Sequence, residues 1–280
     1  MSYAKSGNTH IYYERRGQGP AVVFCHGAGS NAATWWQQLP TFARRYTCIT
    51  IDNRGFGRSV APASGFRLDV FADDVLAVMD AEGIDSAALI CHSLGGMTGL
   101  RLALREPQRV WAFACCDSPM AIRHAQMLAN VRGFFLSVEL GNLENSALSP
   151  GFVQRHPELA VLYRQINQFN PSIFNEEASA GLSARLASLL QLDQLLPLEV
   201  LEVLGCPTLL LVGSEDPIVT PAVVRDVARH IPGSRVVEIE GAGHSPYFEQ
   251  PLRFNTEVLS FLEEAAQALP AAHPMARRTG

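Results

Sequence analysis

A serine lies in the segment CHSLGG at residues 91–96, between an apolar run and a helical pattern. A serine at such a strand–turn–helix junction can act as a nucleophile, because the turn lifts its hydroxyl above the sheet. The helix behind it begins with unpaired N–H groups, so the Leu94 N–H can face a developing oxyanion. We therefore predict that Ser93 is a nucleophile, although this motif alone also fits a turn with a serine N-cap.

The segment departs from the usual G-x-S-x-G pattern at one place. Cys91 stands two residues before the serine, where glycine is expected, while Gly95 keeps the place two residues after it. Cysteine is small and apolar, so we expect the turn to form. We also expect Cys91 to point from the strand end into the packing, which argues against a cysteine nucleophile.

An acid and a base follow two later apolar runs. Residues 213–217 read GSEDP and contain Asp216, and residues 241–246 read GAGHSP and contain His244. Because the carboxyl ends of parallel strands meet at one edge of a sheet, we expect both groups to approach Ser93. A histidine can take the serine proton, and an aspartate can orient that histidine. A solvated turn and a surface histidine are the alternatives.

Other groups compete with or complete this set. Asp117 follows the apolar run at residues 110–116, and Glu215 adjoins Asp216, so either is a rival for the acid. The HGAG segment at residues 26–29 follows another apolar run and is suited to donate a second oxyanion N–H, which we assign to Ala28. His26 and His92 are expected to hold loops by hydrogen bonds.

Short apolar runs alternate with helical patterns along most of the chain, which predicts an α/β fold with a doubly wound, mostly parallel sheet. The expected strands span residues 11–14 (antiparallel, at one edge), 21–25, 47–51, 87–91, 110–116, 208–212 and 235–239. The expected helices between and after them span residues 70–81, 94–104, 222–230 and 248–269.

One stretch breaks this alternation. Residues 121–138, 157–169 and 182–196 show helical patterns without a convincing strand. We therefore expect a helical cap inserted after the sixth strand, over the edge where such sheets bind ligands. The predicted division is a core of residues 1–118 and 206–268, a cap of residues 119–205, and a disordered tail of residues 269–280.

The bulk composition excludes several classes of function. The chain has 280 residues, a formal net charge of −5 and 18% charged residues. Such a mildly acidic surface gives no reason to expect nucleic acid or membrane partners. The six cysteines lack CxxC spacing, and the first residues lack an apolar leader, so we expect free thiols in a cytoplasmic protein. The oligomeric state is left open.

These motifs together resemble the α/β-hydrolase superfamily over nearly the whole chain. The order Ser93, Asp216, His244 is that of the family's triad, and residues 52–59 read DNRGFGRS, similar to its D-x-R-G-x-G-x-S turn. Within the superfamily the chain is most similar to capped esterases and lactonases, with some likeness to 3-oxoadipate enol-lactonases carried by motif form and a cap segment at residues 149–152. The likeness favours Asp216 as the acid.

The resemblance implies a serine hydrolase that cleaves an ester or lactone of a small molecule through an acyl-enzyme, without metal or cofactor. A C–C bond hydrolase or a thioesterase would use the same triad, and a ligand receptor or lyase could share the fold. Arg54 and Arg58 are the candidates for binding an anionic substrate, although no strong basic cluster lies near the motifs. The aromatic residues that could either line the pocket or simply pack are Trp35, Trp36, Phe56, Phe134, Phe135, Tyr163, Phe169 and Phe174.

Overall fold

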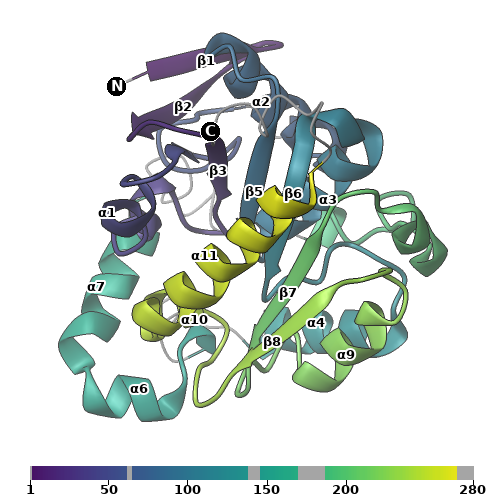
Figure 1. Cartoon of the computed structure of the whole chain (residues 1–280). Helices are drawn as coiled ribbons and strands as arrows, with labels where there is room; N and C mark the ends of the chain where they lie inside the picture. The colour runs from purple at the N-terminus through teal and green to yellow at the C-terminus, as the bar shows by residue number, and fades with distance from the viewer. Residues whose placement is uncertain (1, 62–64, 138–145, 170–186, 270–280) are drawn as a thin grey trace.

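Eight strands form one sheet in the order β1-β2-β4-β3-β5-β6-β7-β8. The computed structural model describes all residues except 1, 62–64, 138–145, 170–186 and 270–280 (Figure 1). The strands are β1 (Ser2–Ser6), β2 (Thr9–Arg16), β3 (Ala21–Cys25), β4 (Thr47–Ile51), β5 (Ala87–His92), β6 (Val110–Cys116), β7 (Thr208–Gly213) and β8 (Arg235–Ile239).

The pairing of these strands confirms the predicted fold class. From β4 through β3, β5, β6 and β7 to β8 every neighbouring pair is parallel, and their side chains are almost all buried. The pairs β1–β2 and β2–β4 are antiparallel, so β2 alone runs against the other strands. The strand predicted at the edge, residues 11–14, lies within β2 and is not at the edge, because β1 lies outside it. β1 was not predicted; its exposed and buried side chains largely alternate, as an edge strand with one solvated face allows.

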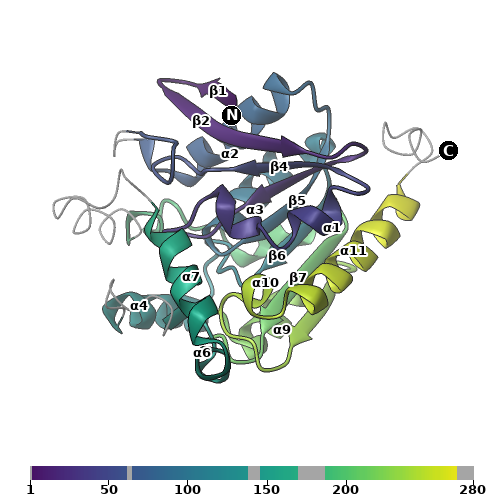
Figure 2. The same ribbon diagram turned by 90° about the vertical axis from the view of Figure 1, so that its left-hand side faces the viewer.

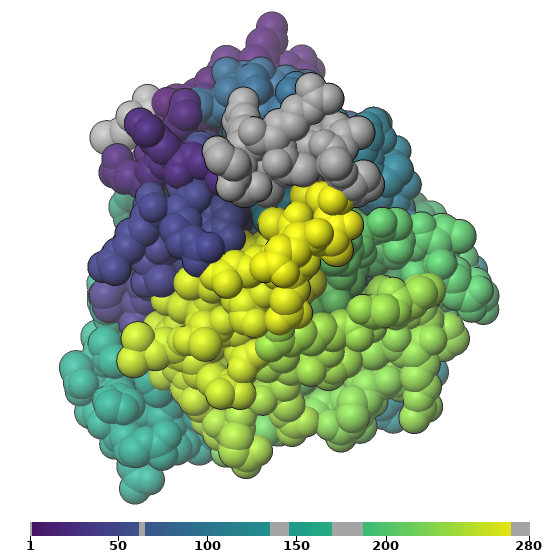
Figure 3. All heavy atoms as spheres, in the orientation of Figure 1, coloured from purple at the N-terminus to yellow at the C-terminus, as the bar shows by residue number. Residues whose placement is uncertain are grey.

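Helices cover both faces of the sheet, and consecutive strand residues point to opposite faces. Val23 packs with α2 and α3, whereas Val22 and Phe24 pack with α1 and α11. In Figure 1, α11 crosses the near face of the sheet, and Figure 3 shows the atoms of this end of the chain as a yellow band across the same side of the molecule. The core helices are α1 (Leu39–Phe42), α2 (Leu68–Ala81), α3 (Leu94–Arg105), α9 (Pro221–Ala228), α10 (Pro246–Glu249) and α11 (Pro251–Ala268), with 3-10 turns η1 (Ala32–Trp35) and η3 (Pro107–Arg109).

The predicted single helix at residues 248–269 is two helices, α10 and α11. Gln250 separates them with φ −132° and ψ 61°, outside the helical region. The cause is Pro251, because the proline ring disfavours a helical conformation in the residue before it. The break leaves α10 as a separate helix of four residues that ends at Glu249.

The described residues between β6 and β7 form helices and turns and no strand of the sheet. They contain α4 (Ala125–Ser137), α6 (Pro150–Arg155), α7 (Pro157–Gln168) and η4 (Leu198–Val203). The six-residue α6 was not predicted from the sequence pattern. The helix predicted at residues 182–196 lies partly outside the described residues, and turns make up most of its described part. Figure 2 shows α6 and α7 lying together beside α10.

Several bulk expectations can be compared with the fold. All six cysteines are free, and all but Cys206 are buried. Among the described helices, none combines the length and apolar composition that a membrane span requires. The exact boundaries of core and cap stay a prediction, and the expected disordered tail lies, apart from Leu269, outside the described residues.

Candidate active site

Ser93 occupies a strained turn between β5 and α3. Its φ of 49° and ψ of −112° lie in a region that non-glycine residues rarely adopt, and its N–H is held by the Cys116 carbonyl at 3.0 Å. The turn leaves no room behind it, because a Cβ on Gly95 would lie 2.2 Å from the Cys25 carbonyl oxygen. Ser93 itself is only partly buried, so its hydroxyl can meet a substrate.

Cys91 lies beneath this turn, as the sequence analysis expected. Its side chain is fully buried, and a Cβ on Gly99 of α3 would approach its sulfur to 2.8 Å. Burial raises the pKa of the Cys91 thiol well above its usual value, which keeps the sulfur protonated and unreactive. The thiol therefore fills the space between sheet and helix.

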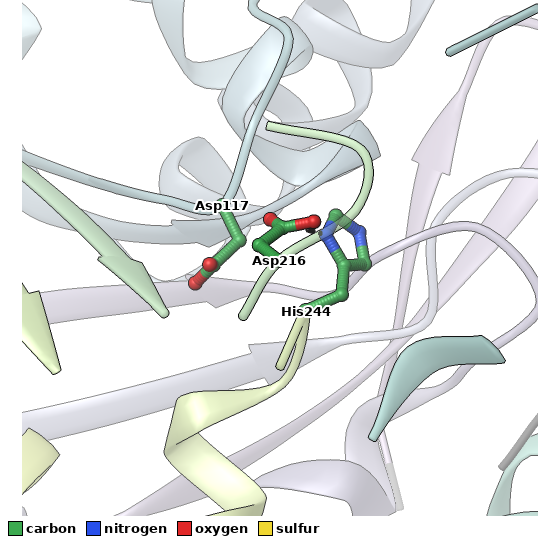
Figure 4. A group of neighbouring side chains, drawn as sticks. All are labelled: Asp117, Asp216 and His244. Atoms are coloured by element: carbon green, nitrogen blue, oxygen red, sulfur yellow. Dashed lines mark hydrogen bonds and ion pairs between the residues drawn. The ribbon is translucent and has the colours of Figure 1, made fainter. Parts of the chain in front are cut away.

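The structure brings Ser93, His244 and Asp216 into one hydrogen-bonded line. His244 Nε2 lies 3.1 Å from Ser93 Oγ, and His244 Nδ1 lies 2.8 Å from Asp216 Oδ2. Figure 4 shows the Asp216 carboxylate aimed at the imidazole ring. With the Nδ1 proton donated to the carboxylate, Nε2 is left as the acceptor for the serine hydroxyl.

Asp216 is itself held in place by the chain that follows it. Its Oδ1 accepts the backbone N–H groups of Ile218 at 2.7 Å and Val219 at 3.1 Å. Both carboxylate oxygens are therefore engaged, one by the backbone and one by His244. The adjacent rival, Glu215, is exposed to solvent.

Asp117, the other rival, is fully buried beside this line but is directed elsewhere. Its Oδ1 accepts the Gly213 N–H at 2.9 Å, and its Oδ2 has no partner among the described residues. In Figure 4 its carboxyl group points away from the imidazole. Burial, reinforced by the charge of Asp216, raises the pKa of Asp117 well above its usual range.

Asp117, Asp216 and His244 place one potential metal-ligand atom each within 4.8 Å of one another. Two of the three already satisfy each other through the Asp216–His244 hydrogen bond. The third is turned away from the ring (Figure 4). The closeness of the three groups is thus accounted for without an ion.

The predicted oxyanion donors flank Ser93. Leu94 is the first residue of α3, and Ala28 lies in the glycine loop, which we define as residues 26–31. This loop approaches the elbow closely, since a Cβ on Gly27 would lie 3.1 Å from Ser93 Cβ and 2.6 Å from His92 Nδ1. Ala28 therefore follows Gly27, which lies against Ser93, and Leu94 directly follows Ser93 in the turn.

His26 and His92 hold loops, as expected. His26 Nε2 accepts the Asn53 N–H at 2.8 Å, so its Nδ1 carries the proton and donates to Gly27. His92 Nε2 donates to the His244 carbonyl at 2.7 Å. Burial lowers the pKa of His26 to about 4 and that of His92 well below its usual value, so both rings are neutral near pH 7.

The two arginines considered for anion binding are engaged by acids of the core. Arg54 forms a buried ion pair with Asp74, and Arg58 pairs with Asp52. Asp52 also accepts the Ala32 N–H at 2.7 Å, which fixes the end of the glycine loop. The D-x-R-G turn is therefore structural here.

The aromatic candidates divide into core and surface positions. Trp35 and Phe56 are fully buried in the core, whereas Trp36 and Phe169 are exposed. The Phe134 ring centroid lies 6.4 Å from that of His244, so this residue of α4 lies beside the hydrogen-bonded line of Ser93, His244 and Asp216. The side chains of Phe135 and Phe174 lie outside the described residues.

Contacts between the cap and the sheet edge were missed by sequence reasoning. Asn31 Nδ2 donates to the Ile166 carbonyl at 2.7 Å, at the end of α7. The Tyr163 hydroxyl, also on α7, lies 2.9 Å from Ser245 Oγ, and Glu249 is bonded to Ser149 at the start of α6. These partners lie 82 to 135 residues apart, and no motif or spacing announces them.

Known proteins resemble this chain over most of its length. A family model described as alpha/beta hydrolase fold matches residues 20–251. The 3-oxoadipate enol-lactonase 2 of Acinetobacter baylyi is 28% identical over 243 residues, covering 85% of this chain and 87% of that protein. A putative carbamate hydrolase of Azorhizobium caulinodans is also 28% identical, covering 95% and 100%. The solved structure of Est816, described as an N-acyl homoserine lactone degrading enzyme, has a TM-score of 0.80 at 29% identity, covering 93% and 100%.

Proposed function

The chain belongs to the alpha/beta hydrolase fold family, and from this premise we propose that it is a serine hydrolase that cleaves a carboxylic ester or lactone of a small molecule through an acyl-enzyme. The observation that carries the proposal is the line of hydrogen bonds from Ser93 Oγ through His244 to Asp216. A nucleophile, a base and an orienting acid in this order are the parts that acyl transfer requires.

In the first half of the proposed reaction, His244 Nε2 takes the Ser93 proton as Oγ bonds to the acyl carbon. Asp216 stabilises the imidazolium that forms, and the N–H groups of Ala28 and Leu94 bind the oxyanion. The tetrahedral intermediate then expels the alkoxide, which receives the proton from His244. The product of this half is an ester of Ser93.

In the second half, water takes the place of the leaving alcohol. His244 removes a proton from the water as the water oxygen attacks the acyl carbon, and then returns that proton to Ser93 as the acid leaves. A lactone follows the same steps, except that its alcohol remains attached to the acyl group as a hydroxy acid. The chain's own residues supply every proton transfer.

Lactones are the substrates we favour first. An enol-lactonase and an N-acyl homoserine lactone degrading enzyme are among the proteins that this chain resembles over more than four fifths of its length. The putative carbamate hydrolase gives reason to include carbamates, since Ser93, activated by His244, can attack their carbonyl carbon in the same way. We propose that the cap, within residues 119–205, selects among these substrates, and that the protein acts in the cytoplasm.

The nucleophile can be tested with Ser93→Ala on a panel of esters, lactones, thioesters, carbamates and diketones. Loss of the hydroxyl should reduce kcat/KM by about 10⁴-fold or more on every substrate that wild type turns over. A phosphonate probe should label wild type at Ser93 and leave the variant unlabelled. Ser234→Ala, which removes a hydroxyl from the α9–β8 connection, should keep full activity. Turnover by Ser93→Ala near the wild-type rate would refute the assignment, and tight binding without turnover would favour a receptor.

A further inference from the structure

We propose that Glu249 is a positioning residue, which fastens the start of α6 to the loop that carries His244 and thereby sets where the imidazole stands. We call residues 241–245 the histidine loop. The inference rests on the proposed function, because it takes His244 to be the base of the reaction.

The carboxylate of Glu249 is buried between two segments that are far apart in the chain. Its Oε1 accepts the Gly243 N–H at 2.8 Å, and its Oε2 accepts the Ser149 N–H at 2.9 Å. Gly243 directly precedes His244, and Ser149 is the N-cap of α6. One side chain at the end of α10 therefore joins the cap to the residue next to the predicted base.

This pair of contacts requires a carboxylate. Both partners are backbone N–H donors, and an ionised carboxylate offers an acceptor on each oxygen. A glutamine of the same size offers one acceptor and one NH₂ donor, so one of the two N–H groups would face a donor. A buried N–H without an acceptor is rare in folded proteins, and the backbone would shift to relieve it.

The backbones of cap and histidine loop are in direct contact at this point. A Cβ on Gly243 would lie 2.6 Å from the Ser149 nitrogen and 2.9 Å from the Leu148 carbonyl carbon. Ser149 Oγ also donates to the Gly241 carbonyl at 3.0 Å, on the other side of the loop. Displacement of the α6 start therefore displaces the histidine loop with it.

The residues on either side of this contact fix the loop further. The His244 carbonyl accepts from His92 at 2.7 Å, and Ser245 Oγ is bonded to Tyr163 of α7. His244 thus sits between Gly243 and Ser245, and each of these neighbours is tied to the cap. The 3.1 Å distance from Ser93 Oγ to His244 Nε2 depends on these ties, and proton transfer depends on that distance.

The test compares Glu249→Gln with Glu257→Gln, a matched control in which a buried carboxylate of α11 loses its charge outside the site. Glu249→Gln should lower kcat by about 10- to 100-fold with KM nearly unchanged, since a misplacement of about 1 Å can cost about 100-fold in rate. Phosphonate labelling of Ser93 should slow by the same factor. Glu257→Gln should lower the melting temperature and leave kcat unchanged.

Chemical rescue separates positioning from space filling. In Glu249→Ala, acetate should restore part of kcat in a saturable manner, because it returns two acceptor oxygens, whereas acetamide should not. The proposal is overturned if kcat of Glu249→Gln stays within about threefold of wild type, or if acetamide rescues Glu249→Ala as well as acetate does. It is also overturned if Glu249→Gln and Glu249→Ala both fail to fold, because Glu249 would then be needed for folding. Turnover by Ser93→Ala would instead refute the proposed function, so the two failures can be told apart.

Discussion

Replacing Asp216 by asparagine should reduce kcat about 10⁴-fold, whereas the same replacement at Asp117 should leave kcat within about threefold of wild type. The two aspartates follow neighbouring strands β7 and β6, and both are buried. The pair of variants therefore tests which carboxylate orients the base, with the same chemical change at two adjacent places.

The large effect at Asp216 follows from its contact with His244. Asp216 Oδ2 accepts the Nδ1 proton at 2.8 Å, which leaves Nε2 free to accept from Ser93. An asparagine that turns its NH₂ group to the ring would favour the opposite tautomer, with the proton on Nε2. A loss of 10⁴ in rate corresponds to about 5.4 kcal/mol of transition-state stabilisation.

The small effect at Asp117 follows from its protonation and direction. Burial and the nearby charge of Asp216 raise the pKa of Asp117 well above its usual range, which favours the neutral carboxyl. Asparagine is also neutral and keeps an oxygen for the Gly213 N–H. The replacement therefore keeps the side-chain hydrogen bond that Asp117 accepts from Gly213.

Steady-state hydrolysis of a p-nitrophenyl ester at pH 7.5 gives kcat for each variant, and circular dichroism confirms that each is folded. Labelling with a phosphonate should remain fast in Asp117→Asn and become slow in Asp216→Asn. A 10⁴-fold loss at Asp117 with little change at Asp216 would refute the reasoning, and would move the acid to the end of β6 without affecting the assignment of Ser93.

Two further predictions concern stability. The pKa of His26 is about 4 in the folded protein against 6.5 for a free histidine, so the unfolded state binds a proton that the folded state does not as pH falls through this window. Between pH 7.5 and pH 4 the unfolding free energy of wild type should fall by about 3 kcal/mol more than that of His26→Gln. Urea unfolding measures this difference, and His10→Gln, which changes an exposed histidine, is the control. Gly95→Ala should cost about 3 kcal/mol or more, because its Cβ would meet a backbone carbonyl of β3 at 2.2 Å, whereas Gly133→Ala in α4, with open space around it, should be neutral or stabilising in thermal melts.

The strands that the sequence predicts most clearly are those in which every residue is buried. β3, β4, β5 and β6 are buried along their whole length, so their apolar runs are unbroken and readable. β1 was missed because it is an edge strand with a polar face. α6 was missed because six residues give too short a pattern to distinguish a helix from a loop.

The candidate site shows the same division. Each triad candidate follows a strand, so its place at one sheet edge was predictable from chain order. The choice between Asp216 and Asp117 was not, because both follow strands and only the direction of each side chain separates them (Figure 4). The role of Glu249 could not be predicted from the sequence, because its hydrogen bond to the cap is made with Ser149, a residue 100 positions away.

The hydrogen bonds that tie α6 and α7 to the glycine and histidine loops limit how this enzyme can be redesigned. A cap transplanted from a relative would have to place partners for Asn31, Ser245 and Glu249 at the same positions, and without them we expect the recipient to lose activity. Among the described residues α4 makes no such hydrogen bond, and its Phe134 ring lies beside His244. A library that varies α4 and leaves α6 and α7 intact is therefore the better route to new substrates.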